Sequence, residues 1–499
     1  MTDSSSPDDP FAVTLDPTSL KRRSVRGSFA TALSQGAKLV IQIGSQIVLA
    51  RLLFPAEYGL IAMAYPIIAL LQVFNDIGLG QAVVQRPTLV QAQVSALVWV
   101  NIVTSCGLAV MVTVLAPLAA WIYGEPRLIW LTIVLGLIFP VTAVSILPNA
   151  LLARHMRFGI MARNEVIAML AGAFVTILCA LAGLSYWSLL IGQFANALTA
   201  IVLVWTVTSW RPDTPRFPRS AWADVKFGAN ITLSNLATFA TTSGDNIIVG
   251  LTTGKVALGL YDRSYSLVAR PIGQMMTPLS RVALPLLSRL TDQPEEYRAA
   301  YLQIFRILTL LIVPAMLVCI TNADVLIGVL LGSRWSGAVP IFSWMCVGGL
   351  TSGVYASTFW LFISQDRAIE LRLYAAVAAG INIASFLIGA FWGVVAIAMA
   401  GAVGFVLLTT PLLLFAATKQ GPIRRRDIIY CSIPFIIAGL LVYAAFVFLF
   451  DRLALNGVGR IIVATLLSYG LFFGISLLSA GNRRLLRGGL RSLKGLLPA

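Results

Sequence analysis

The chain has 499 residues, and its composition excludes a set of soluble domains. Hydrophobic residues make up 58% of the sequence and charged residues only 11%, whereas a soluble protein carries roughly a quarter charged residues. With a mean hydropathy of +0.87, the chain is predicted to be an all-α polytopic membrane protein. Its length allows about a dozen or more spans of about 20 residues and leaves little room for an appended catalytic domain.

The net charge of +16 does not indicate nucleic-acid binding, because the basic residues stand in short clusters between apolar runs. Such clusters are typical of cytoplasmic loops under the positive-inside rule. The five cysteines lack the spacing of metal or redox sites, and His155 is the only histidine. No metal or cofactor is therefore expected, and the sequence contains no P-loop, HExxH or GxSxG motif that would indicate ATP-driven pumping or hydrolysis.

The chain begins with an acidic, Ser/Pro-rich stretch and a basic cluster, so residues 1–27 are predicted to form a disordered, basic cytoplasmic tail. Apolar runs then predict fourteen transmembrane helices. These lie at 28–53, 58–84, 94–121, 128–152, 164–183, 187–208, 228–251, 257–287, 301–320, 338–363, 369–391, 393–417, 428–449 and 459–480. The basic cluster places the N-terminus in the cytoplasm, and an even number of spans returns the C-terminus to the same side. About 26 basic residues then lie inside against about seven outside, which supports this orientation.

An internal repeat appears when the segment from residue 33 is compared with the segment 200 residues later. Matches without a gap are Leu33/Leu233, Ser34/Ser234, Ala37/Ala237, Gly44/Gly244, Ile47/Ile247, Gly59/Gly259, Leu60/Leu260 and Ala69/Ala269. Six spans separate the copies, which predicts a parallel pseudo-twofold repeat about the membrane normal. The expected organisation is a six-helix bundle over 28–209, a cytoplasmic linker over 210–227, a second six-helix bundle over 228–418, two additional helices over 419–480 and a basic tail over 481–499.

Charged residues within the predicted spans are few, and each is a functional candidate because charge at membrane depth is costly. Lys38 and Asp76 are expected at similar depth in the first two spans. They can form either a structural ion pair or a site for substrate or a cation. Asp245, in the seventh span, presents the same two alternatives with Arg263 as its partner.

The eighth predicted span contains Arg270 and Arg281 without an evident carboxylate at matching depth. Arg270 directly precedes Pro271, which removes a helix hydrogen bond and usually kinks the span. A guanidinium near the membrane midplane indicates a water-filled cavity and an anionic ligand, and its paired donors suit phosphate. The alternative is an arginine whose hydrogen bonds go to backbone carbonyls or to a carboxylate placed elsewhere.

Four stretches carry a resemblance to a known family: QIVLARLLFPAEYGLIAMA, FNDIGLGQAVVQR, ALLARHMRF and LGLYDRSYSLVARPIGQMMTPLSRVALPLLSRL. In this order they resemble the Wzx-like polysaccharide transporters, the lipid-linked oligosaccharide flippases of the multidrug/oligosaccharidyl-lipid/polysaccharide exporter superfamily. The resemblance covers nearly the whole chain. It implies two six-helix bundles with two extra C-terminal helices.

The resemblance also implies a function. The expected activity is movement of undecaprenyl-pyrophosphate-linked oligosaccharide across the bacterial inner membrane by alternating access, for exopolysaccharide, capsule or lipopolysaccharide synthesis. By position, it implies pyrophosphate binding for Arg270 and Arg281, ion coupling for Asp76 and Asp245, and either role for Lys38. Expected partners are the lipid-linked oligosaccharide, membrane lipids, H+ or Na+ and a polysaccharide polymerase complex, and no enzyme activity is expected.

Three other functions stay open. A cation-coupled multidrug exporter of the same superfamily should have a site rich in acidic and aromatic residues, whereas the predicted midplane here contains arginine. A peptidoglycan-precursor flippase is disfavoured only because the four stretches look more like polysaccharide transporters. A membrane-embedded glycosyltransferase or polymerase should carry a long outer loop, but the predicted outer loops are short.

Overall fold

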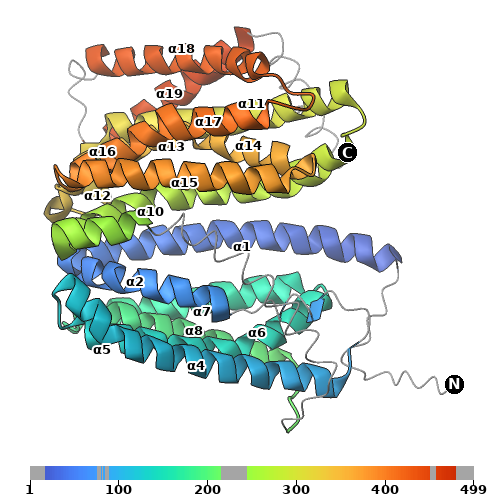
Figure 1. Ribbon diagram of the computed structural model, residues 1–499, viewed down its shortest axis with the longest axis vertical. Coiled ribbons are helices and arrows are strands. Elements are labelled where there is room, and N and C mark those ends of the chain that lie inside the picture. The colour runs from blue at the N-terminus through green and yellow to red at the C-terminus, as the bar shows by residue number, and fades with distance from the viewer. Residues whose placement is uncertain are drawn as a thin grey trace. The chain divides into compact units, whose positions relative to one another are not determined.

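The protein is described here by a computed structural model that covers residues 17–75, 80, 83–84, 89–214, 244–449 and 457–478 (Figure 1). All regular elements in these ranges are helices. Nine helical segments among them are long and apolar enough to cross a membrane. The expected all-helical, multi-pass membrane fold is thus confirmed, while the arrangement of two six-helix bundles plus two helices stays a prediction.

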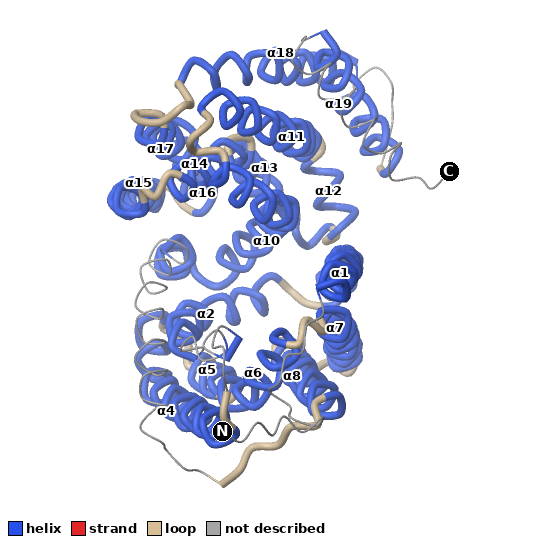
Figure 2. The backbone as a smooth tube through the Cα atoms, turned by 90° about the vertical axis from the view of Figure 1, so that its right-hand side faces the viewer, coloured by secondary structure: helices blue, strands red, loops and turns tan. Residues whose placement is uncertain are grey.

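The chain divides into two compact units, Met1–Gly259 and Leu260–Ala499. The helices of the first are α1 Pro17–Leu52, α2 Pro55–Asn75, α4 Gln91–Tyr123, α5 Leu128–Gly136, α6 Ile138–Arg154, α7 Phe158–Leu181, α8 Trp187–Val207 and the beginning of α10 Gly244–Arg289. Helix α7 packs against α8 and α1, and α4 packs against α5 and α6 (Figure 2).

The second unit contains the rest of α10 and the remaining helices. They are α11 Pro294–Thr321, α12 Ala323–Leu330, η1 Ser333–Trp335, α13 Ala338–Gly349, α14 Ser352–Ser364, α15 Ala368–Ala390, α16 Val394–Gly404, η2 Phe405–Thr409, α17 Thr410–Ala417, α18 Arg425–Leu449 and α19 Val458–Leu478. Helix α11 packs against α13, α18 and α19, and α15 packs against α16.

Several helices differ in extent from the spans that hydropathy predicts. Helix α1 begins at Pro17, within the segment assigned to the cytoplasmic tail, and α7 begins at Phe158 rather than at 164. Helices continue beyond the apolar core because their backbone hydrogen bonds do not depend on side-chain polarity. The span 393–417 is interrupted by the π-helical turn η2 just before Pro411, which has no N–H to continue the α-helical pattern.

The two predicted spans 228–251 and 257–287 meet in the single element α10, which has one non-helical residue, Gly254. Its φ of 79° lies in the left-handed region that glycine adopts without strain. Residues 228–243, which include most of the seventh predicted span, lie outside the described residues.

The glycine pair of the 200-residue repeat makes a reciprocal contact within the first unit. A Cβ atom on Gly59 would lie 1.7 Å from the carbonyl oxygen of Lys255, and one on Gly259 would lie 1.9 Å from that of Pro55. Only glycine allows two helix backbones to approach this closely. Because Pro55 and Lys255 are also 200 residues apart, the contact has the reciprocity of a two-fold axis, which supports the predicted repeat at this point.

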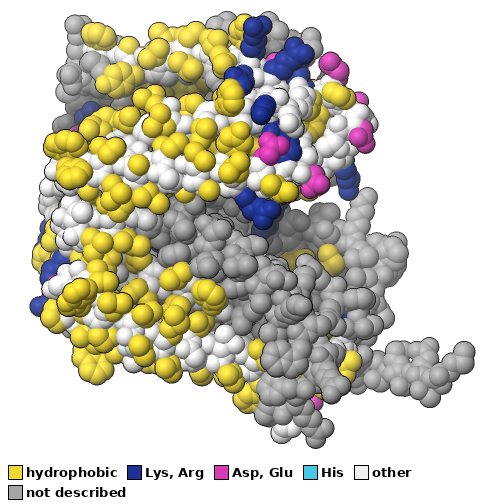
Figure 3. Space-filling model, in the orientation of Figure 1, with side chains coloured by type: hydrophobic (Ala, Val, Ile, Leu, Met, Phe, Trp, Pro, Cys, Tyr) yellow, Lys and Arg dark blue, Asp and Glu magenta, His cyan; other side chains and the backbone are white. Residues whose placement is uncertain are grey.

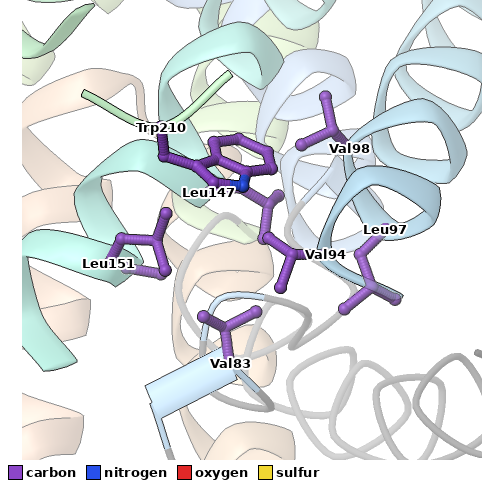
Figure 4. Close-up of a cluster of buried hydrophobic side chains, with 8 residues drawn as sticks. Val83, Val94, Leu97, Val98, Leu147, Leu151 and Trp210 are labelled. Carbon is purple, nitrogen blue, oxygen red and sulfur yellow. The ribbon is translucent and has the colours of Figure 1, made fainter. Parts of the chain in front are cut away.

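Hydrophobic side chains fill the interior of each unit and also cover its outside. In the first unit, Trp210 lies close to Leu147 and Val98 in a buried cluster (Figure 4), although Trp210 is the first residue of the predicted linker. In the second unit, charged side chains gather at one end of the helices and hydrophobic ones cover much of their length (Figure 3). A hydrophobic exterior ending in a charged rim is what a bilayer requires.

Candidate functional site

Lys38 forms an ion pair that the sequence did not predict. Its Nζ atom on α1 donates a hydrogen bond to the carboxylate of Glu165 on α7. The side chain of Lys38 is 17% exposed and that of Glu165 is 52% exposed. Asp76, the partner expected from the sequence, lies outside the described residues.

Glu165 was not predicted as a partner because it lies at the cytoplasmic edge of the predicted span 164–183. Helix α7 begins at Phe158, so Glu165 lies about two turns into the helix. The signal that the sequence offered for this ion pair was a carboxylate within one turn of the edge of a predicted span.

Asp245 and Arg263 both lie on α10, on opposite sides of the kink at Gly254. The Oδ1 atom of Asp245 accepts the backbone N–H of Asn246 at 2.8 Å. The guanidinium of Arg263 donates from Nε to the Oδ2 atom of its neighbour Asp262 at 3.0 Å. Arg263 therefore has a carboxylate partner on its own helix, which the sequence analysis did not consider.

Arg270 and Arg281 lie on one face of α10. Eleven residues are about three helical turns, so the two side chains project in nearly the same direction about 16 Å apart along the axis. Both arginines are exposed, and the polar residues Gln274 and Thr277 lie on the same face between them. The opposite face is apolar and buried, with Val268, Ile272, Ala283 and Leu287.

The two arginines differ in their surroundings. Arg270 takes part in a further interaction within the protein. Arg281 forms no hydrogen bond or ion pair with any residue in the described ranges. Three prolines two turns apart, Pro271, Pro278 and Pro285, accompany the arginines along α10. Each proline leaves one backbone carbonyl without its helical donor, which adds to the polarity of this helix.

A cavity of about 380 Å³ opens in the first unit between α2, α5, α6 and α8. It is lined by Tyr65, Ile68, Gln72, Asn75, Leu135, Ile138, Thr142, Ser145, Ile146 and Gln193. All of these residues are uncharged. This cavity was not predicted from the sequence, because its polar residues are uncharged amides and hydroxyls, although glutamine in an apolar run was an available signal.

A smaller cavity of about 230 Å³ lies in the second unit between α11 and α18. Its lining includes Arg298, Arg306 and Asp427. The Arg298 guanidinium forms an ion pair with the Asp427 carboxylate, which also accepts the backbone N–H of Arg424 at 2.9 Å. The ion pair between Arg298 and Asp427 holds the start of α18 against α11. Within the described residues, no cluster of three metal-ligating side chains occurs.

Comparison with solved structures defines the class of protein. The fold is similar to that of the lipid II flippase MurJ in an inward closed conformation, with a TM-score of 0.70 at 13% sequence identity, covering 91% of this chain and 98% of that one. It is also similar to an inward-facing multidrug resistance transporter of the MATE family in the MOP superfamily, with a TM-score of 0.56 at 13% identity over 80% of this chain and 99% of the other. The chain thus has the fold of these membrane transporters.

Sequence comparison identifies the family. Residues 48–340 match the family described as "Polysaccharide biosynthesis protein", and the chain belongs to this family. The lipopolysaccharide biosynthesis protein WzxC of Escherichia coli K12 is 23% identical over 67% of this chain and 69% of its own length. The teichuronic acid biosynthesis protein TuaB of Bacillus subtilis 168 is 24% identical over 74% and 82%. The succinoglycan biosynthesis transport protein ExoT of Rhizobium meliloti 1021 is 25% identical over 59% and 60%.

Proposed function

We propose that the protein translocates undecaprenyl-pyrophosphate-linked oligosaccharide repeat units across the bacterial inner membrane by alternating access, and that it is a transporter and not an enzyme. Its family and its relatives in lipopolysaccharide, teichuronic acid and succinoglycan biosynthesis support a substrate from polysaccharide synthesis. The product served is an exopolysaccharide, a capsule or a lipopolysaccharide. Both termini lie in the cytoplasm, as the distribution of basic residues predicts.

The observation that carries this proposal is the exposed face of α10 with Arg270, Gln274, Thr277 and Arg281. Two guanidinium groups about 16 Å apart along one helix face, with polar side chains between them, offer successive binding positions for one anionic group. Each guanidinium can hold a phosphate oxygen pair through two parallel N–H···O hydrogen bonds. An uncharged lipid or a cationic drug would gain nothing from them.

The other charged candidates have different support. Lys38 is a weaker anion ligand than the two arginines, because the Glu165 carboxylate already balances its charge. Asp245 and Asp76 are the proposed ion-coupling groups for H+ or Na+. Membrane lipids and a polysaccharide polymerase complex complete the proposed set of partners.

The test is polymer export in cells that carry Arg270→Ala, Arg270→Lys, Arg281→Ala or Arg281→Lys. Loss of a charge-assisted hydrogen bond to phosphate should lower transport about ten- to hundredfold. Lysine keeps the charge but loses the paired donors, so its variants should fall between alanine and the unaltered protein. Arg372→Ala is the matched control, because Arg372 is an exposed arginine on a different helix, α15.

A second readout identifies the substrate. Cells depleted of the protein should accumulate a lipid-linked oligosaccharide on the cytoplasmic side. Continued polymer export without such an intermediate would refute the proposed function, and full activity of both alanine variants would remove the anion site on α10.

A further inference from the structure

The cavity between α2, α5, α6 and α8 presents unused hydrogen-bonding groups of both kinds. Asn75 is buried, with 1% of the residue exposed, and its Oδ1 atom accepts a hydrogen bond from the Ser105 hydroxyl at 2.6 Å. That hydrogen bond orients the amide and leaves the Nδ2 donors without a partner in the described part of the chain. Gln72 is exposed and makes no side-chain hydrogen bond to any residue that the structure describes.

The hydroxyl groups on the facing wall supply acceptors. Thr142 Oγ1 donates to the Ile138 carbonyl at 2.9 Å, and Ser145 Oγ donates to the Thr142 carbonyl at 2.8 Å. Each hydroxyl donates its proton to a carbonyl of its own helix α6, so its lone pairs stay available as acceptors. The cavity therefore combines amide donors on α2 with hydroxyl acceptors on α6.

An aromatic residue and a further amide complete the lining. The Nε2 atom of Gln193 on α8 lies 3.5 Å from the hydroxyl of Tyr65 on α2. Pro66 follows Tyr65 and removes one backbone hydrogen bond from α2. On the other side, α5 and α6 are separated at Leu137. Tyr65 thus offers an apolar ring beside the polar groups of the cavity. It does so where α2 lacks a backbone hydrogen bond and where α5 gives way to α6.

These features select a class of ligand. Among the residues that the structure describes, the cavity lining contains none with a charge, so these residues give neither an anion nor a cation a counter-charge, and desolvating an ion there would be costly. A neutral sugar carries hydroxyl groups that both donate and accept, and it has apolar C–H faces. The volume of about 380 Å³ lies at the lower end of the range for small-molecule sites, about 300–1,000 Å³. That size suits a monosaccharide or disaccharide better than a whole repeat unit.

We propose that this cavity binds a neutral sugar residue of the translocated molecule, with Gln72, Asn75 and Gln193 as donors and Thr142 and Ser145 as acceptors. This inference rests on the proposed function, because it takes the sugar to be part of the lipid-linked substrate. It assigns recognition of two parts of the substrate to two different places in the chain. Arginines of α10 recognise the pyrophosphate that all such substrates share, and the cavity recognises the sugar that differs among them.

The experiment measures sugar binding and lipid binding separately on the full chain in lipid nanodiscs. Saturation-transfer NMR reports binding of free glucose, galactose, mannose, rhamnose and N-acetylglucosamine, with glucuronate as the charged comparison. Undecaprenyl pyrophosphate without sugar reports the anion site. The cavity variants are Gln72→Leu, Gln193→Leu and Thr142→Val, and each should weaken the binding of a neutral sugar by about three- to tenfold for one lost hydrogen bond.

Matched control variants separate binding from folding. Thr199 on α8 makes the same hydrogen bond to the carbonyl four residues earlier as Thr142 does, but lies outside the cavity lining. Gln42 on α1 is a half-buried amide that also lies outside it. Thr199→Val and Gln42→Leu should leave sugar binding within about twofold of the unaltered protein, because no hydrogen bond to the sugar is lost.

The results distinguish the two proposals. Weaker sugar binding in the cavity variants alone, with undecaprenyl pyrophosphate binding unchanged, is the expected outcome. The sugar site is refuted if no neutral sugar of the panel binds, if glucuronate binds more tightly than glucose, or if cavity and control variants behave alike while undecaprenyl pyrophosphate still binds. The transport proposal fails separately if undecaprenyl pyrophosphate does not bind, and the anion site on α10 fails if that binding is unchanged in Arg270→Ala and Arg281→Ala.

Discussion

The reciprocal glycine contact between α2 and α10 should not tolerate a methyl group. In Gly59→Ala the new Cβ would lie 1.7 Å from the Lys255 carbonyl oxygen, and in Gly259→Ala it would lie 1.9 Å from the Pro55 carbonyl oxygen. Ordinary contacts of a Cβ atom begin near 3.4 Å. Because both obstacles are backbone atoms within helices, no side-chain rotation can relieve them, and the two helices must separate by more than 1 Å.

The size of the change in unfolding free energy follows from two opposing effects. Overpacking of this kind costs typically about 1–3 kcal/mol, whereas alanine gains about 0.5–1 kcal/mol over glycine inside a helix. We therefore expect each variant to lose about 1–2 kcal/mol of unfolding free energy. The double variant should lose less than the sum of the two, because the first substitution already opens the crossing that the second requires.

Thermal unfolding in detergent, followed by circular dichroism, measures these differences. Gly107→Ala on α4 is the control, since nothing lies within 4 Å of a Cβ built on Gly107, and it should be slightly stabilising. The contact is refuted if Gly59→Ala unfolds at the same temperature as Gly107→Ala, or if the effects of Gly59→Ala and Gly259→Ala simply add.

Three further predictions concern other contacts. Arg367 is 9% exposed and donates to two carbonyls at the end of α17, so Arg367→Lys should cost about 2 kcal/mol in unfolding free energy; an unchanged melting temperature would contradict this. In a double-mutant cycle with Lys38→Ala and Glu165→Ala, the partly exposed pair should show a coupling of about 0.2–1 kcal/mol that shrinks in high salt; zero coupling at low salt would disprove the pair. Gly192→Ala places a Cβ 1.7 Å from Thr176 Oγ1, so it should lower the melting temperature of the protein. Adding Thr176→Ala should restore part of that loss, and no restoration would argue against this close contact between α7 and α8.

Much of the fold could be predicted because lipid imposes a one-dimensional rule on the chain. A span must be apolar over about 20 residues, so hydropathy alone located helices such as Gln91–Tyr123, Trp187–Val207 and Ala368–Ala390 to within three residues at each end. The kink at Gly254 falls in the connection that hydropathy predicts between the spans 228–251 and 257–287, but the same rule missed the π-helical turn at Phe405–Thr409. Such a turn depends on individual backbone hydrogen bonds, which average hydropathy does not record.

The candidate site was predicted only in part. Depth along the membrane singled out Arg270 and Arg281, and helical periodicity places them on one face, which the exposure of both side chains in the structure supports. The partner of Lys38 could not be found in this way, because Glu165 is 127 residues away along the chain. The sugar cavity was missed because its residues are uncharged and come from four different helices.

The sequence by itself determined that this chain is a helical membrane protein of polysaccharide biosynthesis and which of its few intramembrane charges are functional candidates. Only the tertiary structure decided which side chains face one another, as Lys38 and Glu165 do, and where Gln72, Thr142 and Gln193 meet around one cavity. The physical reason is that hydropathy specifies the depth of a residue in the membrane, whereas the direction of its side chain depends on how each helix is rotated against its neighbours, and that rotation is set by packing.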